Sequence, residues 1–381
     1  MKQGHEVHFL ANAYQGSTID YVKLEGGREF KYKIYGQKYK PYFEDYISHH
    51  LKKTKTDRFI ILLDTFMLHG PNGWFLNIDT SPARTYFWYP SDGGGGMPVG
   101  CHRILQKVEE PVAMARFGQK QVKDYYNIDT KHIPHGVDSK RFYRLPEEDR
   151  NRLKAKYNLS GKFVIGVVAR NQPRKHLDKT IKTMYLLKDK IPNAVLFLHM
   201  DPNDPAGVFY LPNLISRYNL ENRVIFSGMS ALEGIPYEQM NEIYNVMDCF
   251  FLSTSGEGFG IPIIEAMSCE VPVVMTDYTT CQELVKDNNA GLGVNLSGTE
   301  TIDLFKITSK DYDLKAMAGT MTGSWEVERG VIDINDAADK IEYLYKNPDK
   351  CKEFGNNGRK AVLNKYDQEI VNKQWNDLIN N

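Results

Sequence analysis

The sequence predicts an α/β protein of two domains, each with a parallel sheet that helices cover on both faces. Two observations lead to this fold class. Short apolar runs alternate with helical stretches along most of the chain, an order typical of parallel strands joined by crossover helices. At 381 residues, the chain also exceeds what one hydrophobic core ordinarily supports, so two domains of fewer than about 200 residues each are expected.

The first half of the chain predicts a first domain over residues 1–145. Apolar runs predict strands at 7–11, 59–63 and 85–89, and helical patterns lie at 42–53 and 119–126. The segment 145–149 reads Leu-Pro-Glu-Glu-Asp and leads into a charged helix that ends near residue 159. We therefore expect the chain to enter a second domain at about residue 146.

The second half alternates strand and helix patterns more regularly and predicts a second domain over residues 146–364. Strands are predicted at 163–169, 194–200, 223–226, 248–252 and 271–275, with helices between them at 177–191, 211–218, 237–247 and 262–269. Residues 298–329 fit neither period, so we expect an irregular insertion there. An amphipathic helix is predicted at 368–379, near the end of the chain.

Composition argues against several functional classes. The chain has 48 Lys and Arg against 48 Asp and Glu, and this balance disfavours a nucleic-acid partner or a polybasic membrane protein. Its five cysteines are scattered without CxxC spacing, as expected of thiols in a reducing compartment. No apolar run reaches membrane-spanning length and no signal-peptide core is present, which together predict a cytoplasmic protein.

The aromatic and basic segment 35–55 permits two interpretations. Its aromatic rings and cations suit peripheral contact with a membrane surface or a glycan. Such a segment more often forms a solvated amphipathic helix, and the sequence leaves both interpretations open.

Residues 255–277, SGEGFGIPIIEAMSCEVPVVMTD, carry the main functional signal. Pro262 suits the first position of a helix, so the segment reads as a glycine-rich turn and a short helix between two buried strands. Ligands of parallel sheets bind where strands lead into helices. Glu257 in the turn and Glu265 in the first helical turn are therefore expected to face one crevice.

A second signal follows the strand at 163–169, in the segment Arg170-Asn171-Gln172-Pro173-Arg174-Lys175-His176. Arg170 and Lys175 are candidates to converge on one anion, and the N–H groups of the following helix add to the positive potential. A solvated basic loop is the alternative for these residues alone. The glycines at 256, 258 and 260 strengthen the functional interpretation, because they let the backbone approach a phosphate closely.

The combination of cations and carboxylates indicates the class of ligand. Carboxylates repel phosphate but accept strong hydrogen bonds from sugar hydroxyls. A ligand with phosphates in its centre and polyols at both ends, such as a nucleotide sugar, would match central cations flanked by Glu257 and Glu265.

One segment resembles the E-x7-E signature of the family 4 retaining glycosyltransferases. It runs from Glu257 to Glu265 and is followed by Val271-Pro272-Val273-Val274. Further matches lie in the expected order along residues 100–295. They are His132–Asp138 with Phe142, Arg170–Lys175, Phe226–Gly228 and Ala290–Val294.

This resemblance implies a GT-B fold: two Rossmann-like domains with the active site in the cleft between them, and a final helix, residues 365–381, that crosses back onto the first domain. It also implies roles for the site residues. Arg170 and Lys175 would hold the diphosphate and Glu265 the nucleotide ribose. The transferred sugar would meet Glu257 and the backbone of Gly258, Phe259, Gly260 and Ile261, and the base would lie near Gly228, Met229 and Ser230.

The resemblance further implies transfer of a hexose to an acceptor hydroxyl with retention of anomeric configuration. No Asp-x-Asp metal motif lies in the donor region, so fixed cations would replace a metal ion at the leaving diphosphate. We expect no cofactor beyond the donor, a UDP- or GDP-sugar. The expected acceptor is a glycan, a lipid or a protein; a nucleic-acid acceptor is disfavoured.

Three positions depart from the family pattern. The chain is predicted to lack the family's first strand and glycine-rich turn. Where many relatives carry a histidine, this sequence has Tyr89-Pro90-Ser91-Asp92-Gly93. Asp92 would reach into the cleft as a catalytic group, or it belongs to an ordinary Asp-Gly turn. Glu270 stands where relatives usually have glycine.

Two other functions remain open beside the transferase. A catalytically inactive sugar-nucleotide-binding protein would use the same donor residues, as would a nucleotide-sugar epimerase of the same fold. A dinucleotide-dependent oxidoreductase is disfavoured, since no predicted strand leads into a G-x-G-x-x-G turn with an acid about twenty residues later.

Overall fold

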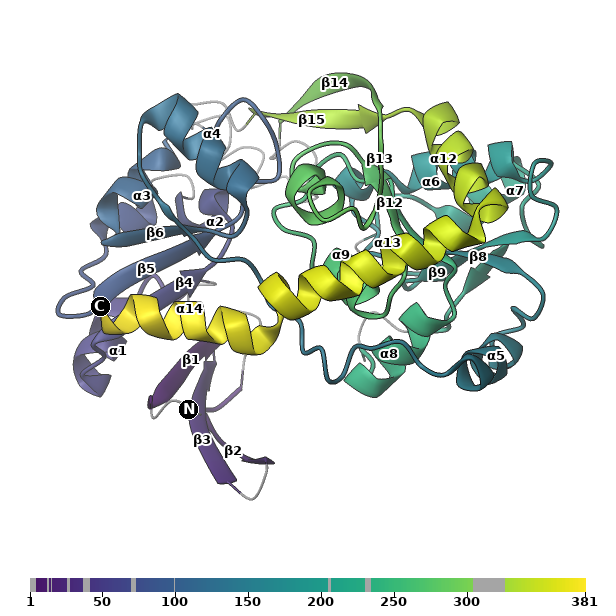
Figure 1. Cartoon of the computed structure of the whole chain (residues 1–381). Coiled ribbons are helices and arrows are strands. Elements are labelled where there is room, and N and C mark those ends of the chain that lie inside the picture. The colour runs from purple at the N-terminus through teal and green to yellow at the C-terminus, as the bar shows by residue number, and fades with distance from the viewer. Residues whose placement is uncertain are drawn as a thin grey trace.

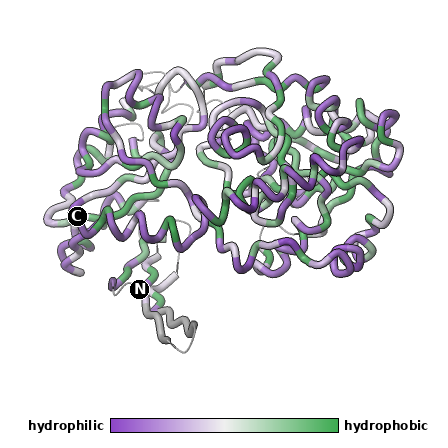
Figure 2. Tube along the Cα trace, viewed as in Figure 1, coloured by the Kyte–Doolittle hydropathy of each residue, from purple (hydrophilic) through white to green (hydrophobic). Residues whose placement is uncertain are grey.

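The computed structural model describes residues 5–11, 14, 16–25, 28–36, 42–69, 73–98, 100–204, 207–229, 234–303 and 326–381. Two α/β domains lie side by side; α13 (Pro348–Ala361) runs along the second of them and α14 (Gln368–Asn380) along the first (Figure 1). Figure 2 shows hydrophobic segments gathered in the strands of both sheets, whereas the peripheral helix α5 (Glu147–Lys156) is mostly hydrophilic. No described helix is both long enough and apolar enough to span a membrane.

The second domain contains a six-stranded, all-parallel sheet in the order β10-β9-β8-β11-β12-β13. Its strands are β8 (Phe163–Val168), β9 (Ala194–His199), β10 (Val224–Phe226), β11 (Cys249–Leu252), β12 (Val273–Thr276) and β13 (Gly291–Val294). The five predicted strands are confirmed to within two residues at each end.

Helices cover both faces of this sheet, as the alternating pattern predicts. They include α6 (Leu177–Leu187), α7 (Leu211–Arg217), α8 (Tyr237–Asn245), α9 (Ile261–Ser268), α12 (Ile334–Lys346) and α13 (Pro348–Ala361). Val164 and Ile165 are consecutive on β8 and enter two different hydrophobic clusters, each of them fully buried. Burial on both faces explains why these strands are continuous apolar runs and do not alternate with polar residues.

The first domain is built on a four-stranded parallel sheet in the order β4-β5-β6-β7. The strands are β4 (Arg58–Leu62), β5 (Arg84–Tyr89), β6 (Glu110–Ala113) and β7 (Lys131–His132). The helices α1 (Ile47–Thr54), α2 (Thr65–His69), α3 (His102–Lys107) and α4 (Arg116–Tyr126) flank it. Phe87 and Tyr89 of β5 are fully buried in its core with Ile104 of α3.

The N-terminal strands form a separate sheet that the sequence only partly predicts. β1 (Val7–Ala11) was expected, but β2 (Ile19–Glu25) and β3 (Arg28–Gly36) were not. The order is β1-β3-β2, and the unit projects from the first domain (Figure 1). In the segment 35–55, α1 packs Ile47 and Leu51 against Phe43, so this part behaves as an amphipathic helix on a core.

The expectation of an irregular insertion at 298–329 is wrong at both of its ends. β14 (Leu296–Asp303) and β15 (Glu326–Ile332) pair antiparallel, and the middle of the segment lies outside the described residues. Exposed and buried residues alternate from Glu326 to Arg329 at the start of β15, but the buried Arg329 interrupts the alternation of charged and apolar residue types that would have signalled a strand.

The predicted crossing helix is confirmed as α14 (Gln368–Asn380). Its Val371 packs with Val112 and Ile133 of the first domain, and the Trp375 and Trp88 ring centroids are 5.2 Å apart. Arg58 Nε also donates a hydrogen bond to the carbonyl oxygen of Ile379, at 2.9 Å. The last helix therefore belongs to the hydrophobic core of the domain that the chain left about 230 residues earlier in sequence.

Glu270 occupies a backbone conformation that explains the family's glycine. It follows the C-terminus of α9 with φ of 58°, and Val271 N–H donates to the carbonyl oxygen of Ala266 at 3.0 Å. This is the left-handed residue that ends many helices, where glycine is preferred because it has no Cβ. A side chain there carries strain.

We expect Glu270→Gly to raise the free energy of unfolding by roughly 0.5–1 kcal/mol, the left-handed penalty less the extra chain entropy of glycine. Chemical denaturation would measure it. Glu270→Ala is the matched control, because it removes the carboxylate but keeps the strained conformation. Equal stability of the two variants would contradict the strain.

Candidate functional site

Two loops at the carboxyl ends of adjacent strands form the candidate site. Residues 169–176 follow β8, and residues 253–260 follow its neighbour β11. Ser255 N–H donates to the carbonyl oxygen of Arg174 at 2.7 Å, and Ser253 Oγ donates to that of Lys175 at 3.1 Å. The loops are thereby fixed to one another at the edge of the sheet where ligands bind in such folds.

Glu257 lies at the centre of this site between two cations. Its Oε1 is 2.5 Å from Lys175 Nζ, its Oε2 is 3.0 Å from Arg174 Nη1, and the residue is only 3% exposed. Burial alone raises the pKa of a carboxyl, but the charges of Lys175 and Arg174 outweigh it and hold the pKa of Glu257 at about 2. Glu257 and Lys175, both expected at one crevice, are thus paired directly with each other, an ion pair that the sequence did not predict.

Asp92 brings the first domain into the same cluster. It follows β5, and its carboxylate lies 3.8 Å from Arg174 Nε and 3.0 Å from Arg329 Nη2. Arg329, on β15, also donates to the backbone carbonyl of Asp92, and its side chain is 3% exposed. Of the two interpretations of Asp92, the structure supports the one in which the carboxylate faces the other domain.

Glycines allow the two domains to meet backbone to backbone beside this cluster. A Cβ on Gly256 would clash with the carbonyl oxygen of Asp92, and one on Gly258 would come within 2.6 Å of Pro90 Cβ. Gly94 and Glu328 also exchange two backbone hydrogen bonds, at 2.9 and 3.1 Å. A side chain at either loop glycine would push the domains apart, which accounts for the glycine-rich turn.

The sequence analysis does not single out three residues of the cluster: Arg174, Arg329 and Asp64. Asp64 follows β4, and together with Asp92 it lines a small cavity of about 30 Å³. Burial and the neighbouring charge of Asp92 raise the pKa of Asp64 to about 6. Its position directly after the strand predicted at 59–63 was the available signal; Arg329 lay in the segment expected to be irregular.

Arg170 does not join the cluster, contrary to the expectation that it converges with Lys175. Its Nε is 3.0 Å from Asp204 Oδ2, and its side chain is 58% exposed. Arg174 lies beside Glu257 instead. The turn at Pro173–Lys175 is a single turn of 3-10 helix, which directs Arg174 and Lys175 toward the loop after β11.

Glu265 lies on α9, apart from the ion pairs. Its Oε2 accepts a hydrogen bond from Tyr244 OH at 2.6 Å. Burial raises the pKa of Glu265 to about 7, against the effect of that hydrogen bond. The two glutamates of the motif therefore differ in charge near neutral pH: Glu257 is ionised and Glu265 is partly protonated.

The other predicted donor-binding residues contribute mainly backbone. The Phe259 ring is buried, 5.3 Å from His135 and 6.2 Å from Tyr366 between centroids, so it belongs to the core. Gly260, with φ of 105°, caps α9, and Ile261 begins that helix at the surface. Gly228 is exposed with φ of 79° and Met229 is half-buried beside it, whereas Ser230 lies outside the described residues.

Within the described parts of the chain, no group of three or more His, Cys, Asp and Glu side chains is arranged to hold a metal ion. The charged groups of the cluster are three acids, Asp64, Asp92 and Glu257, and three bases, Arg174, Lys175 and Arg329. Each of them interacts electrostatically with at least one other member of the cluster.

Comparison with solved structures identifies the fold. Sucrose-phosphate synthase from Thermosynechococcus elongatus aligns over 98% of this chain and 87% of its own, with a TM-score of 0.71 and 19% identity. HepE from Anabaena, solved in complex with UDP, aligns over 92% and 86%, with a TM-score of 0.65 and 16% identity. The chain therefore has the GT-B fold, and that prediction is confirmed.

Comparison of sequences finds a family match over part of the chain. Residues 149–297 match the family of glycosyl transferases group 1, in agreement with the resemblance seen in the E-x7-E motif. Mannosylfructose-phosphate synthase from Agrobacterium fabrum is 31% identical over 40% of this chain and 34% of its own length. A GDP-mannose-dependent phosphatidylinositol monomannoside mannosyltransferase from Mycolicibacterium smegmatis is 30% identical over 45% and 44%. The chain thus spans less than half of the length of either relative.

The raised pKa of Glu265 predicts a pH-dependent stability. The folded protein holds this proton up to about pH 7, whereas the unfolded chain releases it near its ordinary value of 4.5. The contribution of Glu265 to the free energy of unfolding should therefore fall as the pH rises from about 4.5 to 7, and Glu265→Gln should remove that contribution. Buried histidines whose pKa is lowered to about 4, such as His135 and His199, contribute a slope of the opposite sign in both proteins. Urea denaturation of both proteins across this range would measure the difference.

Asp64 titrates in an overlapping range in both proteins, so the difference between the two curves isolates Glu265. Glu242→Gln, which changes a carboxylate paired with Lys156 at the surface, is the matched control. Parallel curves for wild type and Glu265→Gln would contradict the raised pKa.

Proposed function

We propose that the protein is a glycosyltransferase that moves a hexose from a nucleoside-diphosphate sugar to an acceptor hydroxyl, with retention of configuration and without a metal ion. The observation that carries this proposal is the buried Glu257 carboxylate held between Lys175 and Arg174, at the carboxyl edge of a parallel sheet and against Asp92 of the other domain.

The ion pairs indicate how a donor would be accommodated. Lys175 and Arg174 already have a carboxylate partner, so a diphosphate would replace Glu257 as their anion. Glu257 would then be free to accept a hydrogen bond from a sugar hydroxyl. Glu265, on α9, would accept from the ribose hydroxyls.

The bond changes follow from this arrangement. The bond between the anomeric carbon and the phosphate oxygen breaks, and its electron pair leaves with the diphosphate. Lys175 and Arg174 stabilise that developing charge. The acceptor oxygen bonds to the anomeric carbon on the same face, and its proton passes to the departing phosphate oxygen. Closure of the two domains over the donor limits hydrolysis.

The names of relatives support the choice of donor and acceptor. The Mycolicibacterium relative is GDP-mannose-dependent, and HepE has been solved with UDP-glucose. We therefore propose a UDP- or GDP-sugar as donor, with no further cofactor. Relatives named for capsular polysaccharide and lipopolysaccharide core biosynthesis support a glycan or lipid acceptor, with a protein as the remaining class.

The first test is a donor screen with UDP- and GDP-sugars in the presence of EDTA, following release of the nucleoside diphosphate. We expect release from one donor, and a loss of about 10²–10³-fold in kcat for Lys175→Met, which removes charge stabilisation at the leaving group. Lys190→Met, which removes a surface cation paired with Asp339, should retain full activity.

Other outcomes separate the alternatives. Donor binding without release would favour the inactive binding protein, and interconversion of the sugar without an acceptor would favour the epimerase. Activity that disappears with EDTA and returns with a divalent ion would overturn the metal-independent mechanism.

Retention has a separate readout. Once a donor is known, the anomeric configuration of the new glycosidic bond, assigned by NMR from the one-bond coupling between C1 and H1, should match that of the donor. An inverted product would contradict same-face attack while leaving the transferase activity itself intact.

A further inference from the structure

A cavity of about 640 Å³ lies at the opposite edge of the second sheet from the candidate active site. Phe163 at the start of β8, Asp248 just before β11 and Pro272 just before β12 line it. The sheet is parallel, so this amino-terminal edge is separated from the site by the length of the strands. β8 has six residues, which span about 20 Å.

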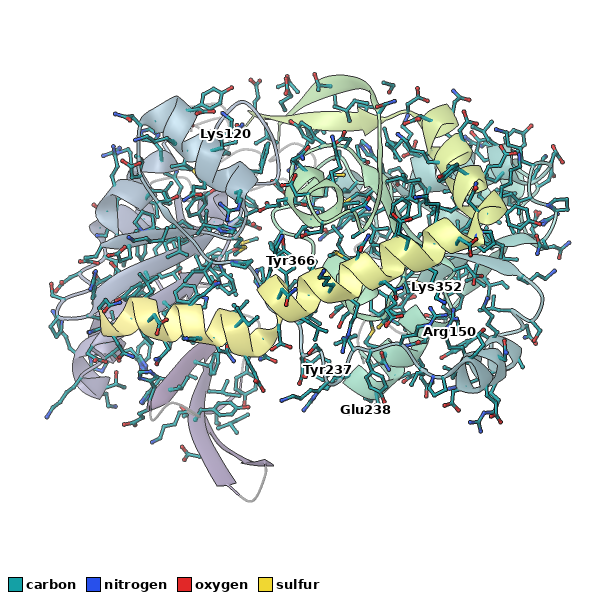
Figure 3. The ribbon with its side chains drawn as sticks, in the orientation of Figure 1. Lys120, Arg150, Tyr237, Glu238, Lys352 and Tyr366 are labelled. Atoms are coloured by element: carbon teal, nitrogen blue, oxygen red, sulfur yellow. The ribbon has the colours of Figure 1, made fainter. Side chains whose placement is uncertain are left out.

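Cations outnumber acids around this cavity. It is lined by Arg144, Arg150, Lys154, Lys162 and Lys352 against Asp248 and Glu270, although the whole chain has equal numbers of both signs. Figure 3 labels Arg150 and Lys352, which lie on the second domain away from its junction with the first. This local excess favours an anionic ligand.

Two of these cations already have partners within the protein. Lys154 Nζ lies 2.8 Å from both oxygens of Asp248, and Arg150 Nε donates to the carbonyl oxygen of Asn245 at 2.9 Å. Lys162 and Lys352 are exposed, and neither side chain has a hydrogen-bond or ion-pair partner among the described residues. Two lysines at the cavity are thus available to an incoming anion.

The remaining walls are apolar, and two carboxylates interrupt them. Phe163 and Tyr345 pack edge to face with centroids 5.3 Å apart, beside Pro272 and Leu344. Glu270 Oε2 lies 3.9 Å from Arg144 Nε, a longer ion-pair contact than that between Lys154 and Asp248. Aromatic faces pack against the carbon skeleton of a sugar, and carboxylates accept hydrogen bonds from its hydroxyls.

Glu270 adds an independent observation. The chain carries a strained, left-handed glutamate where glycine would be relaxed, and this residue lines the cavity. Its backbone cannot shift easily, because α13 packs Gly355 directly onto the Glu270 carbonyl. Backbone strain that the surrounding structure maintains is a reason to look for function. Here the strained residue places a carboxylate, which can accept hydrogen bonds from hydroxyl groups, at a cavity with an excess of cations.

We propose that this cavity is a second binding site, for a phosphorylated sugar, separate from the candidate active site. Lys162 and Lys352 bind the phosphate, Glu270 accepts from the hydroxyls, and Phe163 and Tyr345 cover the ring. The site does not depend on the transferase activity proposed above.

Isothermal titration calorimetry with three probes tests the site: glucose 6-phosphate, inorganic phosphate and glucose. We expect glucose 6-phosphate to bind tighter than either other probe. Lys162→Ala/Lys352→Ala should weaken its binding about tenfold or more, because two charge-assisted contacts are lost. Lys360→Ala/Lys373→Ala is the matched control: both lysines are exposed, lie on α13 and α14, and give the same change in net charge.

Two further variants test whether the ligand binds at this cavity or at the candidate active site, and which groups recognise it. Binding should survive Lys175→Met, which disables the candidate active site. Glu270→Gly should reduce the preference for glucose 6-phosphate over phosphate while the melting temperature rises. Absence of binding to the wild type, equal weakening by both lysine pairs, or loss of binding only in Lys175→Met would each overturn the proposal.

Discussion

The Glu257 carboxylate has almost no contact with water and lies between two cations, and much of the site follows from that constraint. A buried charge is tolerated only with partners at short range. Lys175 and Arg174 can supply them only if the loop after β8 folds back over the loop after β11. The serines at 253 and 255 fix that fold through the backbone carbonyls of the same two residues. The arrangement of the two loops therefore provides the nearby cations that the buried Glu257 carboxylate requires.

The same cluster reaches across the domain boundary. Asp92 follows a strand of the first domain, Arg329 comes from the hairpin of the second, and both meet beside Arg174. Glycines at 256 and 258 let the backbones approach closely enough for these side chains to pair. α14 joins the domains again on another side, through apolar contacts around Trp375. One junction is therefore polar and the other hydrophobic.

The sequence predicts the second domain better than the first, for a physical reason. Strands buried on both faces, such as β8 and β11, are unbroken apolar runs that little else resembles. β2 and β3 mix charged residues with aromatic and aliphatic ones and were not predicted. Glu257 was found because the E-x7-E motif fixes its spacing from Glu265, and Lys175 because it lies in a run of cations after a predicted strand. Asp64 and Arg329 reach the site through tertiary contacts between segments far apart in sequence, which no local pattern encodes, and Arg170 matches the motif yet pairs with Asp204.

The polar junction also bears on the timing of a catalytic cycle. Two backbone hydrogen bonds between Gly94 and Glu328 and the Asp92–Arg329 ion pair close the domains on one side, while α14 stays packed across them. Entry of the proposed donor between the loops would require these polar contacts to break, and the domains would then part about the apolar helix. Domain motions of this kind occur in microseconds to milliseconds, so the rate of the proposed transfer would respond to solvent viscosity where opening limits it.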